Sequence, residues 1–448
     1  MNKRTTILCA VLLQAGLLFS SCNKDDSQEN EETTVTLPGS NVEEDDDYTL
    51  NTSGATVITL NQTSISISGT GATASGTTAT ITEAGTYRVV GTLLSGQLVV
   101  NADTSDKVKI MLDGASVTGS GDAPIRVKSA SKTILYLMPG TISSLTDASG
   151  NASEAVVYSA SNLSVFGTGT LSVNAKEDAG IDAEGGIILK EGTFSITSAG
   201  SAIKSSDNVT VDGGTYTLAA GNDGLHADAA LNINGGNITI TKSEEGLEGE
   251  VITITGGEAR LVSTDDGLNG SSDTDATCYL YMKGGYLYIN AGGDGVDVNG
   301  SIEMSGGTII VDGPTSNADG PIDYDNSFKM TGGYLLAVGS SGMAQLPGAT
   351  STQPSVLVTF GSSLQAGTLV NISNAAGTNI LTYAPAKAYQ SVVLSSPALV
   401  AGTSYSVYTG GTATGSLLDG LYSSAIYTGG TLRTGFTISS VVTKIGAN

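Results

Sequence analysis

The chain contains no tryptophan, few charged residues and no collagen-like triplet period. Of its 448 residues, 14% are charged and 39% are hydrophobic, whereas an average globular protein has roughly 25% charged residues. This balance excludes a charge-driven disordered chain and a coiled coil. Glycine is abundant, at 60 residues, but the absence of a Gly-X-Y period excludes collagen. Abundant Thr, Ser, Val, Ile, Gly and Asn instead favour strands joined by tight turns.

The N-terminus resembles a bacterial secretion signal. Residues 1–21 begin with Lys3 and Arg4, continue with an apolar stretch, and end in Leu-Phe-Ser-Ser before Cys22. This pattern predicts a lipoprotein signal peptide with lipid on Cys22. A transmembrane helix or an ordinary cleaved signal is the alternative, but a spanning helix needs about 20 apolar residues. Residues 23–26 resemble surface-export signals, so we expect an outer-membrane protein that is lipid-anchored at the cell surface.

An acidic segment separates this signal from the first strands. Residues 23–50 contain ten acids and one lysine, so we predict a disordered tether over residues 22–50. Of the three cysteines, Cys9 leaves with the signal and Cys22 carries lipid. Cys278 alone remains, and no intrachain disulfide is expected. No later segment is long and apolar enough to span a membrane.

From about residue 120 the sequence repeats itself. Gly-Gly pairs begin at positions 213, 235, 256, 284, 306 and 332. An acid, a glycine and an apolar residue recur in step with them, as in Asp223-Gly224-Leu225, Glu245-Gly246-Leu247, Asp266-Gly267-Leu268 and Asp294-Gly295-Val296. Runs of alternating apolar and polar residues between these features predict strands with one buried face. Two or three strands in each repeat of about 22 residues indicate a solenoid.

The repeat length distinguishes between the kinds of β solenoid. A left-handed hexapeptide helix needs a strict period of about 18 residues, and calcium-roll repeats need a Gly-Gly-x-Gly-x-Asp string that is absent. We therefore predict an all-β chain with a right-handed parallel β-helix over residues 51–340, including an N-terminal cap. Residues 341–448 keep strand patterns but lose the repeat. They form either a β cap or a separate small β module.

Negative charge is concentrated in a few coils. The formal net charge is −24, and residues 220–325 contain 18 acids but only three bases. The repeat places these acids in two columns. The first contains Asp223, Glu245, Asp266, Asp294 and Asp319, and the second contains His226, Glu248, Asn269, Asp297 and Asp323.

Stacked carboxylates need a counter-charge. Coils of a solenoid lie about 4.8 Å apart, where two carboxylates repel by roughly 1 kcal/mol in water and more near a protein surface. Calcium suits such a site because it takes oxygen ligands, and we expect glycine to turn backbone carbonyls toward the ion as well. The predicted calcium ligands are Asp223, Glu245, Glu248, Asp265, Asp266, Asp294, Asp297, Asp319 and Asp323. The alternative is that acid–Gly pairs merely mark turns.

The repeated coils, together with the string Gly342-Met343-Ala344-Gln345 that follows them, resemble a known family. It is the family of bacterial cell-surface carbohydrate-binding β-helix proteins, whose fold is related to that of pectate lyases. The resemblance covers roughly residues 85–440. It implies a right-handed β-helix, bound calcium, and binding of acidic plant polysaccharide or cellulose without cleavage. At Ser201-Ala202-Ile203 the acid is missing, so no ion is expected there.

The sequence offers weak candidates for catalysis. A calcium-dependent lyase needs a base such as Lys242, Arg260 or Lys283, but each of these also suits the role of partner to a neighbouring carboxylate. His226 is the only histidine, and no Gly-x-Ser-x-Gly motif is present. We predict a protein without catalytic residues. A calcium-dependent polysaccharide lyase and a surface adhesin or structural protein with a non-glycan partner remain the alternatives.

Contacts to a sugar would have to come from tyrosine, because tryptophan is absent. There are 17 tyrosines, and Tyr286 and Tyr334 directly follow Gly-Gly turns. We predict that these two residues, with Lys242 and Lys283, bind polysaccharide such as polygalacturonate or cellulose. Packing between neighbouring strands is the alternative for the tyrosines. The negative field disfavours nucleic acid, and a polyuronate would need calcium as a bridge. The sequence leaves the oligomeric state open.

Overall fold

The computed structural model describes residues 41–50, 52–150, 153–272 and 277–447. In these residues the chain forms strands and one 3-10 turn, η1 (Thr52–Gly54), and no α-helix. None of these residues belongs to a helix long and apolar enough to cross a membrane. The predicted signal peptide, Cys22 and residues 22–40 of the predicted tether lie outside the described residues. The predicted all-β class is confirmed.

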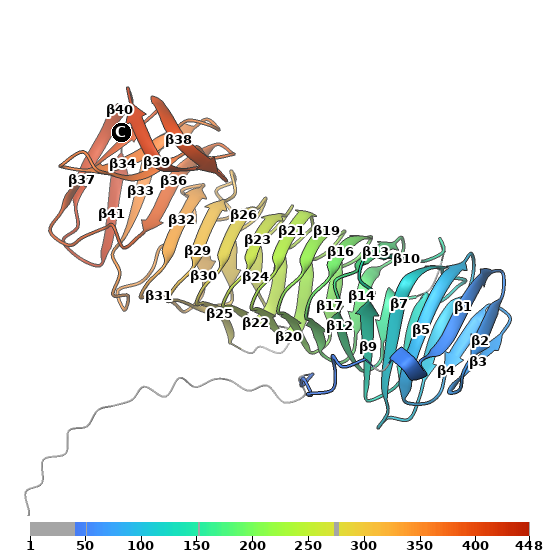
Figure 1. The fold of residues 1–448 in the computed structure, drawn as a ribbon. Coiled ribbons are helices and arrows are strands. Elements are labelled where there is room, and N and C mark those ends of the chain that lie inside the picture. The colour runs from blue at the N-terminus through green and yellow to red at the C-terminus, as the bar shows by residue number, and fades with distance from the viewer. Residues whose placement is uncertain (1–40, 51, 151–152, 273–276, 448) are drawn as a thin grey trace, which may run out of the picture. The chain divides into compact units, whose positions relative to one another are not determined.

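The repeat forms three ladders of parallel strands, seen as successive coils in Figure 1. The first ladder contains β10 (Ile142–Thr146), β13 (Thr170–Ala175), β16 (Thr193–Ser198), β19 (Thr215–Ala219), β21 (Asn237–Lys242), β23 (Glu258–Val262), β26 (Tyr286–Asn290), β29 (Thr308–Asp312) and β32 (Tyr334–Gly339). The second contains β8 (Ile125–Ser129), β11 (Ala155–Ser159), β14 (Ala179–Ala183), β17 (Ile203–Ser205), the first parts of β20 (Leu225–Ile233) and β22 (Leu247–Ile254), β24 (Leu268–Gly270), β27 (Val296–Val298) and β30 (Asp323–Tyr324). The third contains β9 (Lys132–Leu137), β12 (Asn162–Phe166), β15 (Ile187–Leu189), β18 (Asn208–Val211), the second parts of β20 and β22, β25 (Cys278–Met282), β28 (Gly300–Met304) and β31 (Ser327–Met330).

The apolar residue of each acid–Gly–apolar triplet, and Ile203 at the same position of the copy that lacks the acid, point into the solenoid. In the second ladder the register partners are Ile203, Leu225, Leu247, Leu268 and Val296. All five side chains are at most 2% exposed, and burying each contributes roughly 1.5–3 kcal/mol. One coil cannot cover these side chains alone, so stacking supplies the core. The predicted parallel β-helix, with successive partners 22 residues apart at Ile203, Leu225 and Leu247, is confirmed.

The glycine of the triplet is required by close packing between coils. At Gly267, a Cβ atom would lie 2.2 Å from Cγ2 of Ile289 and 2.6 Å from the carbonyl oxygen of Gly295. The amides of Gly267 and Leu268 donate hydrogen bonds to the carbonyls of Asp294 and Gly295 in the next coil. Each of these carbonyls accepts one hydrogen bond between coils, so the expectation that glycine turns them toward an ion stays a prediction.

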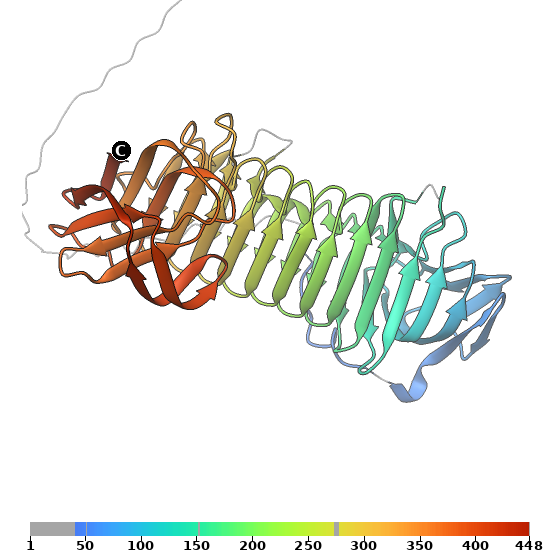
Figure 2. The same ribbon diagram turned by 90° about the horizontal axis from the view of Figure 1, so that it is seen from above.

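Antiparallel hairpins close the N-terminal end of the solenoid (Figure 2). The strands of this end are β1 (Thr56–Gln62), β2 (Ile65–Ser68), β3 (Ala72–Ser75), β4 (Thr78–Ile81), β5 (Gly85–Leu93), β6 (Gln97–Asn101) and β7 (Lys107–Thr118). β1 pairs antiparallel with β2, and β3 with β4. β1 and β4 continue in parallel to β5 and β6, which lead into the coils. The hairpins cover the open end of the sheet.

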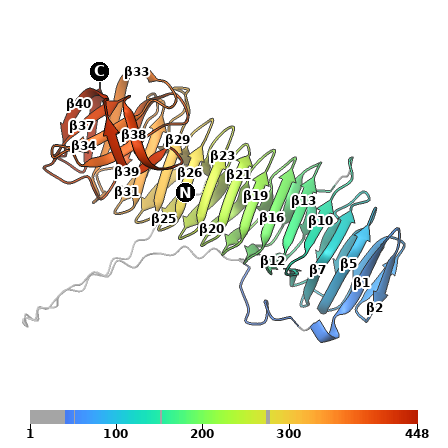
Figure 3. The same cartoon turned by 45° about the horizontal axis from the view of Figure 1, so that its top comes forward.

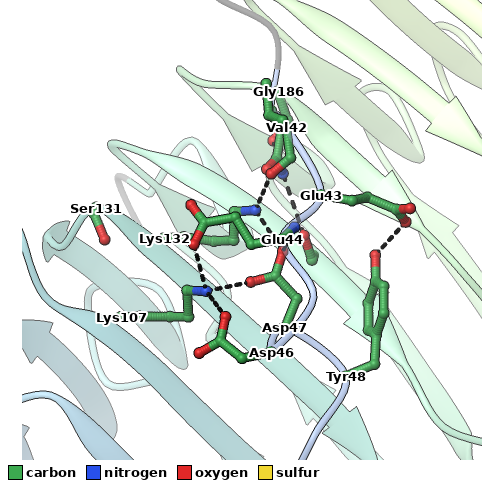
Figure 4. A network of polar contacts seen from close by, with 12 residues as sticks. Val42, Glu43, Glu44, Asp46, Asp47, Tyr48, Lys107, Ser131, Lys132 and Gly186 are labelled. Atoms are coloured by element: carbon green, nitrogen blue, oxygen red, sulfur yellow. Dashed lines mark hydrogen bonds and ion pairs between the residues drawn. The ribbon is translucent and has the colours of Figure 1, made fainter.

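Residues 41–50 pack on the solenoid, which contradicts this part of the predicted disordered tether. The Asn41 side chain donates hydrogen bonds of 3.0 Å to two solenoid carbonyls. Asp47 is fully buried and forms ion pairs with Lys107 and Lys132 (Figure 4). The acidic composition was therefore a poor guide here, because the folded solenoid supplies a basic surface that neutralises these acids.

The C-terminal region is both a cap and a module. Its strands are β33 (Ser355–Leu364), β34 (Val370–Asn374), β35 (Asn379–Tyr383), β36 (Tyr389–Ser395), β37 (Ser404–Thr409), β38 (Thr412–Leu418), β39 (Leu421–Thr428), β40 (Thr431–Thr437) and β41 (Val442–Ala447). β36 pairs antiparallel with β32 and β33, and β33 pairs with β41. The other six strands form a separate sheet (Figure 3). The core of this region includes Ile310, Leu336 and Val338, so the module packs on the outer face of the first ladder.

Candidate metal centre

Strand pairing aligns the second acidic column as predicted. His226, Glu248, Asn269, Asp297 and Asp323 are successive register partners. In the first column, hydrogen bonds between coils link Asp223, Glu245, Asp266 and Asp294 in turn. The next position is held by Gly320, because the amide of Gly295 donates to its carbonyl. The predicted place of Asp319 in this column is therefore wrong, since the longer turn before it shifts the alignment by one residue.

Asp266, Asp294 and Asp297 form a compact carboxylate cluster, which we call the acidic cluster. One oxygen from each of the three side chains lies within 4.8 Å of the others. All three side chains are partly buried. Burial raises the pKa of Asp266 and Asp297 to about 7 and that of Asp294 to about 6, and neighbouring carboxylates add to each rise. The protein holds these charges together at a cost unless protons or a cation balance them.

In the coils before the acidic cluster, the side chain of His226 supplies the positive charge. His226 Nδ1 lies 2.6 Å from Glu248 and 3.2 Å from Asp223, and its Nε2 lies 2.8 Å from Asp228. Burial lowers the pKa of His226, but hydrogen bonds to Asp223, Glu248 and Asp228 outweigh it and raise the pKa to about 11. His226 is therefore positively charged at neutral pH. It balances Asp223 and Glu248, two of the predicted calcium ligands.

Glu245 and Asn269 lie between these two groups and leave oxygens without partners. Asn269 Nδ2 donates a hydrogen bond of 2.8 Å to Glu245 Oε1. Glu245 Oε2 and Asn269 Oδ1 are buried, and neither accepts a hydrogen bond within the described residues. Burial raises the pKa of Glu245 to about 8, with contributions from the charges of Glu248, Asp223 and Asp266. A buried oxygen without a donor costs roughly 1–3 kcal/mol, which a bound cation would relieve.

The donor set fits a hard divalent cation. The acidic cluster offers three carboxylates. Asn269, the register partner of Asp297, and Glu245, in the coil before Asp266, offer two further buried oxygens. Calcium takes 6–8 oxygen ligands and accepts irregular geometry. Side-chain oxygens supply most of this donor set, and the backbone carbonyls of these turns each accept one coil-to-coil hydrogen bond.

The remaining predicted ligands lie off the acidic cluster. Asp265 is exposed. The carbonyl of Asp319 accepts a hydrogen bond from Ser340. Asp323 accepts hydrogen bonds from the side chain of Gln345 and from the backbone amide of Tyr324. Gln345 belongs to the string Gly342-Met343-Ala344-Gln345 that follows the last coil. Its side-chain amide therefore lies at the end of the second acidic column.

The two predicted sugar-binding tyrosines pack against the C-terminal region. The Tyr286 hydroxyl donates a hydrogen bond of 2.8 Å to Asp419, and the Arg260 guanidinium lies 5.4 Å from its ring. Tyr334 packs against the core of the C-terminal region. Neither ring is a free stacking surface, because the module covers both. The two lysines predicted to bind polysaccharide, Lys242 and Lys283, are both exposed.

Two other tyrosines of the same repeat face outward. Tyr279 and Tyr281 on β25 stack with ring centroids 5.6 Å apart and planes at 8°. The Lys283 ammonium lies 5.6 Å from the centre of the Tyr281 ring. The sequence indicates their outward orientation, because residues 278–282 alternate and Cys278, Leu280 and Met282 are the buried positions. Burial raises the pKa of the Cys278 thiol to about 11, and the charges of Glu250, Asp297 and Asp325 add to the rise.

Of the candidate basic residues, Arg260 and His226 are engaged with acids, whereas Lys242 and Lys283 are exposed. Burial lowers the pKa of Arg260, but hydrogen bonds to Asp419 and Glu258 outweigh it and raise the pKa. His226 is held protonated by three acids. Neither is a neutral base poised to remove a proton.

Comparison with known proteins identifies the family. A family model described as carbohydrate-binding domain-containing protein matches residues 75–230 and 227–436. A relative of that description from Acetivibrio thermocellus is 32% identical over 124 residues, which is 26% of this chain and 43% of the relative. This chain thus spans less than half the length of that relative. A solved structure, the polysaccharide lyase-like protein from C. thermocellum in a gadolinium derivative, is 21% identical with a TM-score of 0.36 and covers 66% of this chain and 98% of its own. The chain belongs to the family of carbohydrate-binding domain-containing proteins.

Proposed function

We propose that this protein is a cell-surface lipoprotein that binds acidic polysaccharide through calcium held by the acidic cluster, without cleaving the glycan. The observation that supports this most directly is the cluster of Asp266, Asp294 and Asp297, whose carboxylate oxygens lie within 4.8 Å of one another, together with the buried Oδ1 of Asn269, the register partner of Asp297. Such a donor set lacks only a cation. Membership of the carbohydrate-binding family supplies the class of ligand.

The charge of the acidic face explains why a cation is needed. Residues 220–325 contain 18 acids and three bases, and this field repels a polyuronate chain. A bound calcium ion would accept oxygens from the protein and from a uronate carboxylate together. Asp266, Asp294 and Asp297 would hold such an ion, and the stacked coils keep one oxygen of each within 4.8 Å of the others. Binding of an acidic glycan should therefore depend on calcium.

Tyr279, Tyr281 and Lys283 are suited to contact the sugar chain. Tyr279 and Tyr281 occupy alternate outward positions of β25, and Lys283 directly follows the strand and is exposed. Aromatic rings pack against the apolar faces of sugars, and a lysine pairs with uronate carboxylates. This surface takes the role that the sequence assigned to Tyr286 and Tyr334, and Lys283 keeps its predicted role.

Affinity electrophoresis tests the proposal. The full mature protein is run through gels that contain polygalacturonate or cellulose, with calcium or with chelator. We expect retardation by polygalacturonate with calcium, and its loss on chelation and in Asp266→Asn and Asp297→Asn. Asp265→Asn is the matched control, because this acid lies next to the acidic cluster but is exposed. Equal retardation with and without calcium would overturn the role of the ion, and release of unsaturated or reducing ends would favour a lyase or hydrolase.

Anchoring at the outer membrane rests on the N-terminal motif. Residues 1–21 followed by Cys22 have the order of a lipoprotein signal peptide. Lipid on Cys22 would keep the solenoid at the membrane surface, where it could capture polysaccharide from the surroundings.

A further inference from the structure

Residues 41–49, which we call the strap, cross the outer face of the third ladder at the coils of β7, β9, β12 and β15. The Asn41 side chain reaches the carbonyls of Leu163 and Gly186, 3.0 Å away in each case. At the other end, Lys109 donates a hydrogen bond of 2.8 Å to the carbonyl of Thr49. Figure 4 shows the strap held between these ends by ion pairs.

The acids of the strap meet lysines that project from the solenoid. Asp47 is fully buried, 2.6 Å from Lys107 and 2.7 Å from Lys132. Lys107 also pairs with Asp46 at 2.5 Å. Further along, Lys190 pairs with Glu43 at 2.9 Å.

An aromatic surface lies beside these lysines. Tyr136 and Phe166 are register partners on β9 and β12, and their ring centroids are 4.6 Å apart. The Tyr48 ring of the strap packs on Phe166 edge to face, at 5.0 Å and 64°. Lys190 lies 5.6 Å from the centre of the Tyr48 ring. The strap thus presents an aromatic ring and carboxylates to an aromatic and cationic surface.

Without the strap this surface would be cationic. Lys107 and Lys132 are direct register partners in adjacent parallel strands, which lie about 4.8 Å apart. Lys109 and Lys190 project from the same outer face. Two ammonium groups so close repel each other unless anions lie between them. The surface therefore needs anionic groups in addition to Asp212, which pairs with Lys190 at 2.9 Å, and the acids of residues 43–47 supply them.

We propose that the surface under the strap is a second, calcium-independent binding site for an anionic polysaccharide, and that the strap occupies it as an internal competitor. A polyuronate offers the same two features as the strap, which are carboxylates at regular intervals and rings that pack on aromatic side chains. Because the strap is part of the chain, it competes at a high effective concentration. A ligand binds only in the fraction of molecules whose strap is open. This inference shares with the proposed function only the class of ligand, since its site lies far along the sequence from the acidic cluster and needs no metal.

Hydrogen exchange on the full mature protein in chelator tests the displacement directly. Addition of polygalacturonate should increase deuterium uptake in residues 41–49 and decrease it in β9 and β12. A neutral cellulose oligomer of similar length is the control and should change neither segment. Unchanged or reduced uptake in the strap at saturating polygalacturonate would overturn the proposal.

A strap-loosening variant provides a second measurement. Asn41→Gly combined with Glu43→Gln and Tyr48→Ser removes contacts at both ends but leaves the buried Asp47 in place. In chelator it should bind polygalacturonate at least about tenfold more tightly than the wild-type protein, with marked salt dependence. Adding Lys107→Gln and Lys190→Gln should abolish that gain. If the loosened variant keeps the wild-type melting temperature and binds no more tightly, the strap is only structural and the proposal fails.

The two proposals fail in different ways. Loss of calcium-dependent retardation would refute the acidic cluster as a glycan site, whatever happens in chelator. Failure of both strap measurements would refute the second site, whatever happens with calcium.

Discussion

The backbone amide of Asp294 donates a hydrogen bond of 2.7 Å to Oδ1 of Asp266, its equivalent one coil earlier. The amide of Gly320 donates in the same way to Asp294. The stacking of the coils thus fixes where these carboxylates lie, and it does so through hydrogen bonds of the protein itself. Asparagine keeps an oxygen that can accept the amide hydrogen bond, so Asp→Asn changes the charge with little change in shape.

Calcium should stabilise the folded protein. Rigorous chelation should lower the melting temperature, because a ligand that binds only the native state adds about 2.7 kcal/mol at a hundredfold excess over its dissociation constant. Magnesium should restore it poorly, since it prefers a tighter octahedral site. Scanning calorimetry of the wild type, Asp294→Asn and the control Asp265→Asn measures this. A wild-type melting temperature that does not respond to chelation, with metal loss confirmed by elemental measurement, would contradict it.

The chelated protein should lose stability as the pH rises. Burial raises the pKa of Asp266 and Asp297 to about 7 and of Asp294 to about 6. Between about pH 4 and pH 7 the folded state therefore binds more protons than the unfolded chain, and the free energy of unfolding falls with pH. Denaturant unfolding at pH 5, 6, 7 and 8 should show this fall, and Asp266→Asn should reduce its slope. A flat profile would show that these carboxylates titrate normally.

The outward tyrosines should contribute to glycan affinity. Tyr281→Ala should weaken polygalacturonate binding by about two- to tenfold, the range expected for one aromatic contact. Lys283→Gln should weaken binding of polygalacturonate but not of a neutral glycan. Tyr334→Phe serves as the comparison, because this ring packs against the C-terminal core. Isothermal titration in calcium measures all three, and equal affinities for Tyr281→Ala and the wild type would place the sugar elsewhere.

Gly267→Ala should destabilise the solenoid. The added Cβ would lie 2.2 Å from Ile289 and 2.6 Å from the Gly295 carbonyl oxygen, and overpacking of this kind costs about 1–3 kcal/mol. Gly54→Ala is the control, since a Cβ added there would meet no atom within 4 Å beyond its chain neighbours. Equilibrium unfolding in guanidinium compares the two. Similar midpoints would mean that the coils can move apart more easily than their hydrogen bonds suggest.

Cys22 should decide where the protein resides. Cys22→Ala should prevent acylation and move the protein from the membrane fraction to the soluble fraction. Metabolic labelling with a fatty-acid analogue and membrane fractionation measure the two effects. A variant that stays unlabelled yet remains with the membrane would point to another anchor.

The sequence alone was sufficient to predict the repeated coil and the column of buried apolar side chains inside it. The spacing of Leu225, Leu247 and Leu268 predicted their stacking, because a solenoid repeats the same local environment in each coil and periodicity reports it directly. The same regularity aligned Glu248 with Asn269 and Asp297. It failed at Asp319, where a longer turn shifts the register by one residue and local spacing no longer measures position.

Which outer side chains are free depends on contacts that form only in the folded molecule. Tyr286 follows a Gly-Gly turn just as a free stacking residue would, yet Asp419, 133 residues away, accepts its hydrogen bond. Asp47 lies in an acidic run typical of a disordered tether, yet Lys107 and Lys132 bury it against the solenoid. In both cases the partner is distant in the chain. An outward residue in a solenoid carries no periodic sign of what covers it, so the contact has to be read from the tertiary structure.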